Sequence, residues 1–183
     1  MTTPREHWAD VADQYGVART VGWCTDLLTG AVTIEDPENP AFNALGSGGH
    51  LQRILDGGSP DYWIRVWAAR GLLYVWDDMA VAAVVAGLAD EHWRVREMCA
   101  KVCRSRGLGE AGDDLDSLVA DEVPRVRQAA VRALAGLGEA EHARVIRQAV
   151  NDVDVKVSSA AEATLDAMSE RLDRDLRLDG DDL

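Results

Sequence analysis

Residues 121–134 read Asp-Glu-Val-Pro-Arg-Val-Arg-Gln-Ala-Ala-Val-Arg-Ala-Leu, and this stretch decides the fold. Val126, Ala130 and Leu134 follow one another at four-residue intervals, so they lie on one side of an α-helix. Pro124 suits the first turn of that helix, because the N–H that proline lacks has no partner there. The small Ala130 in the middle of the stripe allows a neighbouring helix to approach closely. The stretch therefore predicts a helix that packs against others.

The same pattern recurs every 31 residues on both sides of this stretch. Segments that begin at Ser59, Asp90, Asp121 and Asp152 align without a gap. Three apolar columns run through them: Ile64, Val95, Val126 and Val157; Ala68, Cys99, Ala130 and Ala161; and Leu72, Cys103, Leu134 and Leu165. Self-similarity at a fixed period is the signature of a repeat array. It predicts four equivalent helices over about residues 62–76, 92–105, 123–136 and 155–169.

A second amphipathic stretch precedes each of these helices, over about residues 50–56, 78–89, 111–120 and 140–150. Asp77, Asp113 and Glu139 stand near three of the predicted starts, where a carboxylate stabilises the free backbone N–H groups. Gly107 and Gly138 follow two of the stripe-bearing helices, where a left-handed residue ends a helix at little cost. One such hairpin cannot bury its own apolar stripe, whereas stacked hairpins can.

We therefore expect an all-α fold, an α-solenoid of about four helix–turn–helix repeats. No segment alternates with a period of two residues, so we expect no sheet. Residues 50–172 are assigned to the repeat array. Residues 1–49 do not follow the period and predict an N-terminal cap of one or two helices, followed by a loop rich in helix breakers. Residues 173–183 predict a frayed acidic tail.

The motif Asp-x-x-Pro-x-Val-Arg-x-x-Ala-x-x-Ala-Leu stands almost complete from Asp121 to Leu134. It resembles the consensus of bacterial HEAT repeats, the short type also found in phycobilin-lyase-like proteins. The resemblance covers about residues 50–169. It is specific for the fold and nearly silent on activity, because one fold hosts many functions.

The resemblance also implies a structural ladder of charged side chains between neighbouring repeats. In this chain it implies Asp90 with Arg96 and Asp121 with Arg127 as structural pairs. Two positions depart from the pattern: Ser59 in place of the Asp of the first repeat, and Ser158 in place of the Arg of the last. Terminal repeats are often atypical, because one of their faces meets solvent.

Composition limits the partners and the compartment. The chain carries 19 Lys and Arg against 32 Asp and Glu, a net charge of −13, which opposes general affinity for nucleic acid or an anionic membrane. No apolar run approaches the length of a membrane span, and no signal peptide is visible. Three cysteines are too few, and odd in number, for a disulfide framework. We expect a cytoplasmic protein, and the Arg-rich, Lys-poor usage suggests a bacterial source.

No catalytic or metal-binding arrangement stands out. Cys99 and Cys103 lie four apart and could be read as metal ligands with His92, but the repeat places both in core columns. A zinc site needs four well-spaced ligands, which the sequence does not assemble. No phosphate-binding loop or nucleophile motif is present either. We therefore predict a protein without enzymatic activity, metal or cofactor.

Two groups of residues are candidates for partner binding. A basic row beyond the core stripe consists of Arg70, Lys101 and Arg132, with Arg104 one turn further on. It is either a solvated helix face or a binding stripe for an acidic protein segment or a phosphate. Trp63 and Trp67 in the first repeat either pack under the N-terminal cap or serve as exposed anchors, the residue type that dominates protein-binding hot spots.

The leading hypothesis for function is a protein–protein interaction scaffold that binds an unidentified protein or peptide in the concave groove of the solenoid. A first alternative is a HEAT-like DNA-binding or DNA glycosylase-type repair protein, which the net charge of −13 opposes. A second alternative is a bilin lyase or bilin chaperone, which the resemblance to phycobilin-lyase repeats suggests.

Overall fold

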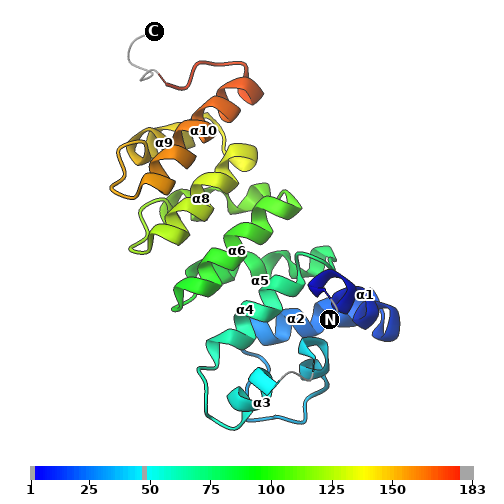
Figure 1. Ribbon diagram of the computed structural model, residues 1–183. Coiled ribbons are helices and arrows are strands. Elements are labelled where there is room, and N and C mark those ends of the chain that lie inside the picture. The colour runs from blue at the N-terminus through cyan, green and yellow to red at the C-terminus, as the bar shows by residue number, and fades with distance from the viewer. Residues whose placement is uncertain (1–2, 47–48, 178–183) are drawn as a thin grey trace. The chain divides into compact units, whose positions relative to one another are not determined.

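The computed structural model describes residues 3–46 and 49–177 (Figure 1). The described residues form helices and no strand, as the sequence predicts. The chain divides into two compact units, residues 1–102 and residues 103–183, and each is described by itself.

The N-terminal unit contains five α-helices and three 3₁₀ turns among its described residues, and a sixth helix, α6, crosses its boundary. In chain order they are α1 (Pro4–Tyr15), α2 (Val17–Thr29), η1 (Pro40–Leu45), α3 (Gly49–Leu55), α4 (Tyr62–Gly71), η2 (Asp78–Ala80), α5 (Val81–Ala86), η3 (Gly87–Ala89) and α6 (Trp93–Arg106). The stretch predicted as one helix over 78–89 is η2, α5 and η3 in direct succession. The turn η1 is not predicted by the sequence, because breakers surround it on both sides.

The helix α2 forms the centre of the N-terminal unit. It packs against α1, η1, α4 and α5. Val21, Cys24 and Leu27 on its inner face are buried. Gly16, with a φ of 86°, separates it from α1. The N-terminal segment therefore shares a core with the first predicted repeat.

The helix α4 is shorter than predicted, because it ends at Gly71 instead of continuing to residue 76. Beyond Gly71 the backbone tightens: the N–H of Tyr74 donates to the carbonyl of Gly71, three residues back (2.8 Å). A Cβ at position 71 would lie 2.5 Å from the ring of Trp8. Only glycine allows this contact, and glycine is also a poor helix former. Gly71 therefore accounts both for the packing of Trp8 and for the early end of α4.

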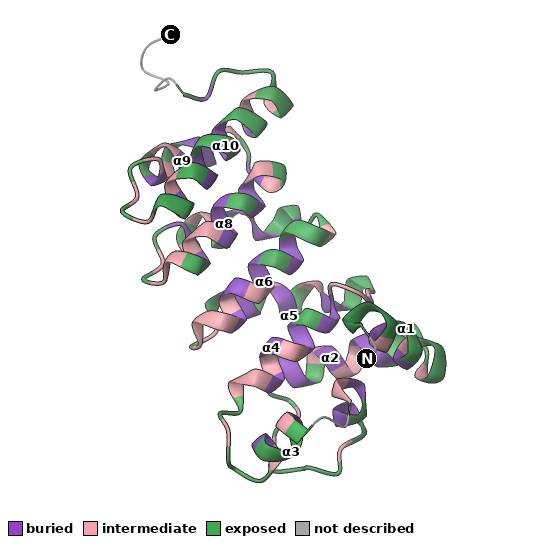
Figure 2. Ribbon diagram, in the orientation of Figure 1, coloured by how far each residue is buried: buried purple, intermediate pink, exposed green. Residues whose placement is uncertain are grey.

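The C-terminal unit contains η4 (Gly109–Ala111), α7 (Gly112–Leu118), α8 (Pro124–Leu137), η5 (Ala140–His142), α9 (Ala143–Ala149) and α10 (Val155–Leu172). The helix α8 packs against both α7 and α10, and α10 also packs against α9. In Figure 2 the buried residues of α8 and α10 follow one side of each helix. Val126, Ala130 and Leu134 are all fully buried, as the apolar stripe predicts.

Two predictions for this unit are wrong. Gly138 has a φ of −71°, so it is not a left-handed helix end, unlike Gly107 with its φ of 71°. Glycine is needed at 138 because a Cβ there would approach the carbonyl oxygen of Leu134 to 2.8 Å. Residues 173–177 of the tail are not frayed. Leu176 is buried, and its N–H donates to Ser169 Oγ at 3.1 Å. The remainder of the predicted tail, residues 178–183, lies outside the described residues.

Candidate partner-binding site

A basic pocket opens on the C-terminal unit, with a volume of about 870 Å³. It is lined by α8, by α10 and by Arg104 at the end of α6. Its charged residues are Arg104, Arg132 and Lys156, and none of the described residues that line it is acidic. The sequence predicts the first two of these three cations as partner-binding residues.

Helical spacing and side-chain size create this pocket. Gln128, Arg132 and Ala135 form one stripe of α8, next to the core stripe. On α10 the facing positions are held by small residues, among them Ala160 and Ala163. Long cationic side chains beside short ones leave a hollow that is positive along its edges.

Two hydrogen bonds between α8 and α10 fix this geometry. Thr164 Oγ1, which is buried, donates to the carbonyl oxygen of Val131 at 3.1 Å. Gln128 Nε2 donates to the carbonyl oxygen of Lys156 at 3.0 Å. Both bonds join α8 to α10 beside the pocket, so its two walls are tied together. The pocket is therefore part of a packed pair of helices and not a loop surface.

The three cations of the basic pocket carry uncompensated charge. The side chains of Arg104, Arg132 and Lys156 form no ion pair with any residue in the described ranges. Arg104 and Arg132 are exposed, and so is Lys156. In a chain of net charge −13, this cluster creates a local region of positive electrostatic potential.

The other predicted members of the basic row differ from these. Lys101 Nζ lies 2.7 Å from Glu97 Oε1, and Glu97 is buried. The Lys101 ammonium group therefore stabilises a carboxylate of its own helix. Arg70 lies in the N-terminal unit, where it lines a separate pocket together with Trp67. The structure thus brings Arg104 and Arg132 together and leaves Lys101 and Arg70 out of that site.

Trp63 belongs to a stack of rings and cations in the N-terminal unit. The guanidinium of Arg94 lies 5.1 Å from the centre of the Trp63 ring and 4.2 Å from that of Trp93. Trp63 also stacks on Trp67 with 6.1 Å between centroids. Each such cation–π contact contributes about 0.5–1 kcal/mol when partly exposed. Since Arg94 covers Trp63, this residue fits an internal packing role better than that of a free anchor.

A histidine extends the same stack. The ring of His92 lies on Tyr62 with 3.4 Å between centroids and an interplanar angle of 9°. Burial and the nearby Arg94 guanidinium lower the pKa of His92. The sequence gives no signal for these contacts, because their residues come from different helices.

The charged residues of the predicted ladder make both backbone and side-chain contacts. Arg127 and Asp121 contact each other, but the arginine donates to the backbone carbonyl of Asp121 (2.9 Å). Its ion pair is with Asp152, which follows it by 25 residues, at 2.6 and 2.8 Å. These bonds lower the pKa of the Asp152 carboxyl.

The N-terminal unit repeats this arrangement. Arg96 donates to the backbone carbonyl of Asp90 at 2.9 Å, and the Asp90 carboxylate accepts from Arg65 at 2.8 and 3.3 Å. Asp90 with Arg96 and Asp121 with Arg127 are thus in contact through a backbone carbonyl. In both units an arginine bridges from one repeat to the aspartate of the next.

Metal-binding clusters and reactive thiols are two kinds of chemical group that could give the described residues a catalytic role. No group of three or more His, Cys, Asp or Glu residues among them could hold a metal ion. Cys24, Cys99 and Cys103 are fully buried, and burial raises the pKa of the Cys24 and Cys103 thiols to about 12. Thiols in this state are poor nucleophiles.

No known family model matches the chain, and no curated protein is significantly similar to it in sequence. Within residues 3–46 and 49–177, no helix combines the length and apolar character that crossing a membrane requires.

Proposed function

We propose that this chain is a HEAT-like helical-repeat module that binds an acidic protein segment in its basic pocket and catalyses no reaction. The observation that supports this most strongly is the pocket formed by Arg104, Arg132 and Lys156, whose charges have no acidic partner among the described residues. Unpaired cations on packed helices are a common basis for recognising acidic peptide motifs.

The repeat pattern supports the HEAT-like part of the proposal. The 31-residue period coincides with two successive hairpins in the C-terminal unit, η4 and α7 with α8, then η5 and α9 with α10. The Arg127–Asp152 pair joins these hairpins. Stacked hairpins of this kind form a solenoid, in which each repeat buries its apolar stripe against the next.

An extended acidic peptide fits the pocket better than nucleic acid does. The three cations form one short cluster, whereas a duplex needs a basic stripe that follows the phosphate backbone. The net charge of −13 also repels a long polyanion but acts weakly on a short acidic segment. Ser159 and Gln128 supply neutral hydrogen-bonding groups beside the cations.

Binding of a fluorescent Glu-rich peptide, measured by anisotropy at an ionic strength of about 0.1 M, tests the proposal. We compare the wild type with Arg104→Glu/Arg132→Glu. As a matched control we use Arg144→Glu/Arg174→Glu, which reverses two exposed charges outside the basic pocket. Exposed charge pairs contribute about 0.5 kcal/mol each, and reversing two charges removes two attractions and adds two repulsions, so we expect a loss of about 2 kcal/mol, or about thirtyfold in affinity.

The control variant should bind the peptide within about threefold of the wild type, because the general field falls off over about 10 Å. Equal losses in the pocket and control variants would attribute binding to net charge and refute the pocket. A single-stranded DNA of equal charge that binds more tightly than the peptide would favour the nucleic-acid alternative.

A further inference from the structure

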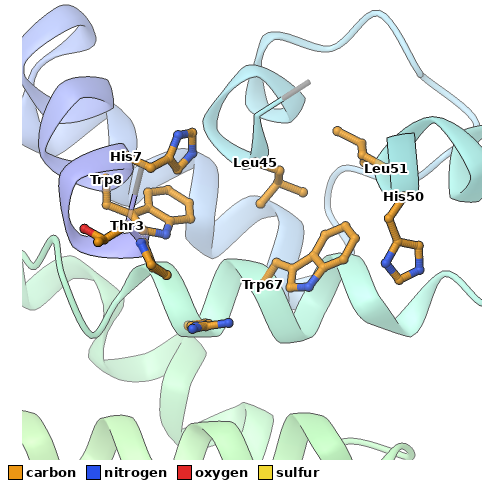
Figure 3. Close-up of a pocket in the computed structure, with 9 residues that line it drawn as sticks. Thr3, His7, Trp8, Leu45, His50, Leu51 and Trp67 are labelled. Atoms are coloured by element: carbon orange, nitrogen blue, oxygen red, sulfur yellow. The ribbon is translucent and has the colours of Figure 1, made fainter. Parts of the chain in front are cut away.

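A second pocket lies in the N-terminal unit, with a volume of about 330 Å³. We call it the indole pocket; the residues that characterise it are Trp8, Leu45, His50, Leu51, Trp67 and Arg70. They come from α1, η1, α3 and α4. Figure 3 shows Leu45 projecting between Trp8 and Trp67, with Leu51 and His50 beyond Trp67. Four short elements thus converge on a hollow that none of them fills.

The two indoles of this pocket are held in fixed orientations. Trp8 is buried against Gly71, whose missing Cβ makes room for the ring. His50 meets Trp67 edge to face, with 4.9 Å between centroids and an interplanar angle of 82°. Its Nε2 is in turn hydrogen-bonded to Ser59 Oγ at 3.1 Å. The aromatic walls are therefore in place before any ligand arrives, which lowers the entropic cost of binding.

The pocket contains one free charge. His7 Nε2 is engaged by the carbonyl oxygen of Ala44 at 2.8 Å, so this ring nitrogen is not available to a ligand. Arg70 is exposed, and its guanidinium makes no hydrogen bond or ion pair with the residues that the structure describes. No aspartate or glutamate lines the pocket. The pocket is therefore suited to a ligand with an anionic group that can pair with the Arg70 guanidinium.

We propose that the indole pocket binds a small planar aromatic carboxylate, whose ring packs against the apolar walls formed by Trp8, Leu45 and Trp67 and whose carboxylate pairs with Arg70. Small-molecule sites typically have volumes of about 300–1,000 Å³, apolar walls and a few polar groups. A cavity of about 150 Å³ holds benzene, so a hollow about twice that size suits a bicyclic ring with a short acidic group. The planar guanidinium binds a carboxylate through two parallel hydrogen bonds.

Other ligand classes satisfy only part of this site. A neutral aromatic molecule leaves Arg70 without a counter-ion, and an inorganic anion leaves the indole walls uncovered. An aromatic amine places a second positive charge beside the guanidinium. This proposal concerns a different pocket from the acidic-peptide site and stands independently of it.

Isothermal titration calorimetry with three bicyclic probes of equal ring size tests the proposal. The probes are naphthalene-1-carboxylate, the neutral naphthalene-1-methanol and the cationic naphthalene-1-methylamine. We expect the wild type to bind the carboxylate about tenfold more tightly than the alcohol and the amine least. Equal affinity for all three probes, or no binding of the carboxylate at millimolar concentration, would overturn the proposal.

Variants assign the effect to Arg70. Arg70→Met removes the charge and keeps the length of the side chain, and we expect it to bind the carboxylate about tenfold more weakly and the alcohol as before. Arg53→Met is the matched control, because Arg53 is exposed in the same unit and lies outside the pocket. Arg70→Lys keeps the charge but cannot form two parallel hydrogen bonds, so we expect its affinity for the carboxylate to lie between those of the wild type and Arg70→Met. If Arg70→Met and Arg53→Met bind the carboxylate equally well, the guanidinium has no part in recognition.

Discussion

Replacing Arg127 by methionine tests how the repeats are joined. The guanidinium donates two hydrogen bonds to the Asp152 carboxylate, at 2.6 and 2.8 Å, and two to the carbonyls of Asp121 and Glu122, at 2.9 and 3.3 Å. The side chains of Arg127 and Asp152 are only 13 % and 10 % exposed. One link thus joins residues that are 25 positions apart in the sequence.

The expected cost follows from these contacts. Breaking a fully buried pair costs about 3–5 kcal/mol, and a hydrogen bond to a charged group contributes about 1.5–3 kcal/mol. Asp152 keeps one donor, the N–H of Asp154 at 2.8 Å, and is close enough to the surface to be rehydrated. We therefore expect Arg127→Met to lower the free energy of unfolding of the C-terminal unit by about 3 kcal/mol.

The distribution of aromatic residues makes the assay specific. All six tryptophans and three tyrosines lie within residues 1–102, so intrinsic fluorescence follows the N-terminal unit alone. Hydrogen exchange measured on peptides from α8 and α10 follows the C-terminal unit. Arg65→Met breaks the equivalent pair with Asp90 and should appear in the fluorescence-detected urea midpoint.

Arg144→Met is the control, because Arg144 is exposed on α9 and has no ion pair with the described residues. It should change the free energy of unfolding by less than about 0.5 kcal/mol. If Arg127→Met has as small an effect on hydrogen exchange in α8 and α10, the Arg–Asp link does not stabilise the packing of the hairpins, and the argument is refuted.

Three further predictions concern pH, thiol chemistry and packing. The pKa of Asp152 is lowered in the folded state, so its stabilisation relative to Asp152→Asn is complete above the unfolded value of about 3.9 and is lost as the pH falls through the lowered value; urea denaturation at neutral and acidic pH should show the two proteins converging only in acid. Since burial raises the pKa of Cys24 and Cys103 to about 12, both thiols should react with Ellman's reagent only as fast as the chain opens, and immediate reaction at mildly alkaline pH would contradict their burial. Gly71→Ala should lower the fluorescence-detected stability by about 2 kcal/mol through the clash with Trp8, and an unchanged urea midpoint would show that the ring moves aside freely.

Periodicity predicts the helical part of the fold well, because the apolar stripe is a direct consequence of 3.6 residues per turn. The stripe of α8 is buried as expected, and Pro124 begins the helix. Local exceptions are harder to predict. The end of α4 depends on Trp8 packing against Gly71, which are far apart in the sequence. Leu176 is buried only because the chain turns back after α10, and an acidic composition gives no sign of that.

The candidate sites show the same difference between local patterns, which the sequence reveals, and contacts between distant residues, which it does not. Arg104 and Arg132 could be predicted, because they project beside a recognisable core stripe. Lys101 is predicted as a member of the basic row, although its spacing of four residues from Glu97 suits the ion pair that the structure shows. The place of Lys156 in the basic pocket is not predicted, because its repeat column reads as plain surface. The stack around Arg94 depends on contacts between helices that no local pattern encodes.

Site-directed photo-crosslinking shows whether an acidic peptide occupies the basic pocket. A cysteine introduced at Ser159, inside the basic pocket, can be labelled selectively with a benzophenone, because the native cysteines are buried. Ser117→Cys is the matched control, since Ser117 is exposed on α7 outside the pocket. We expect that a Glu-rich peptide crosslinks from position 159, that Arg132→Glu abolishes the product and that position 117 gives little. Equal crosslinking from positions 159 and 117, unaffected by Arg132→Glu, would contradict the assignment of the basic pocket as the binding site.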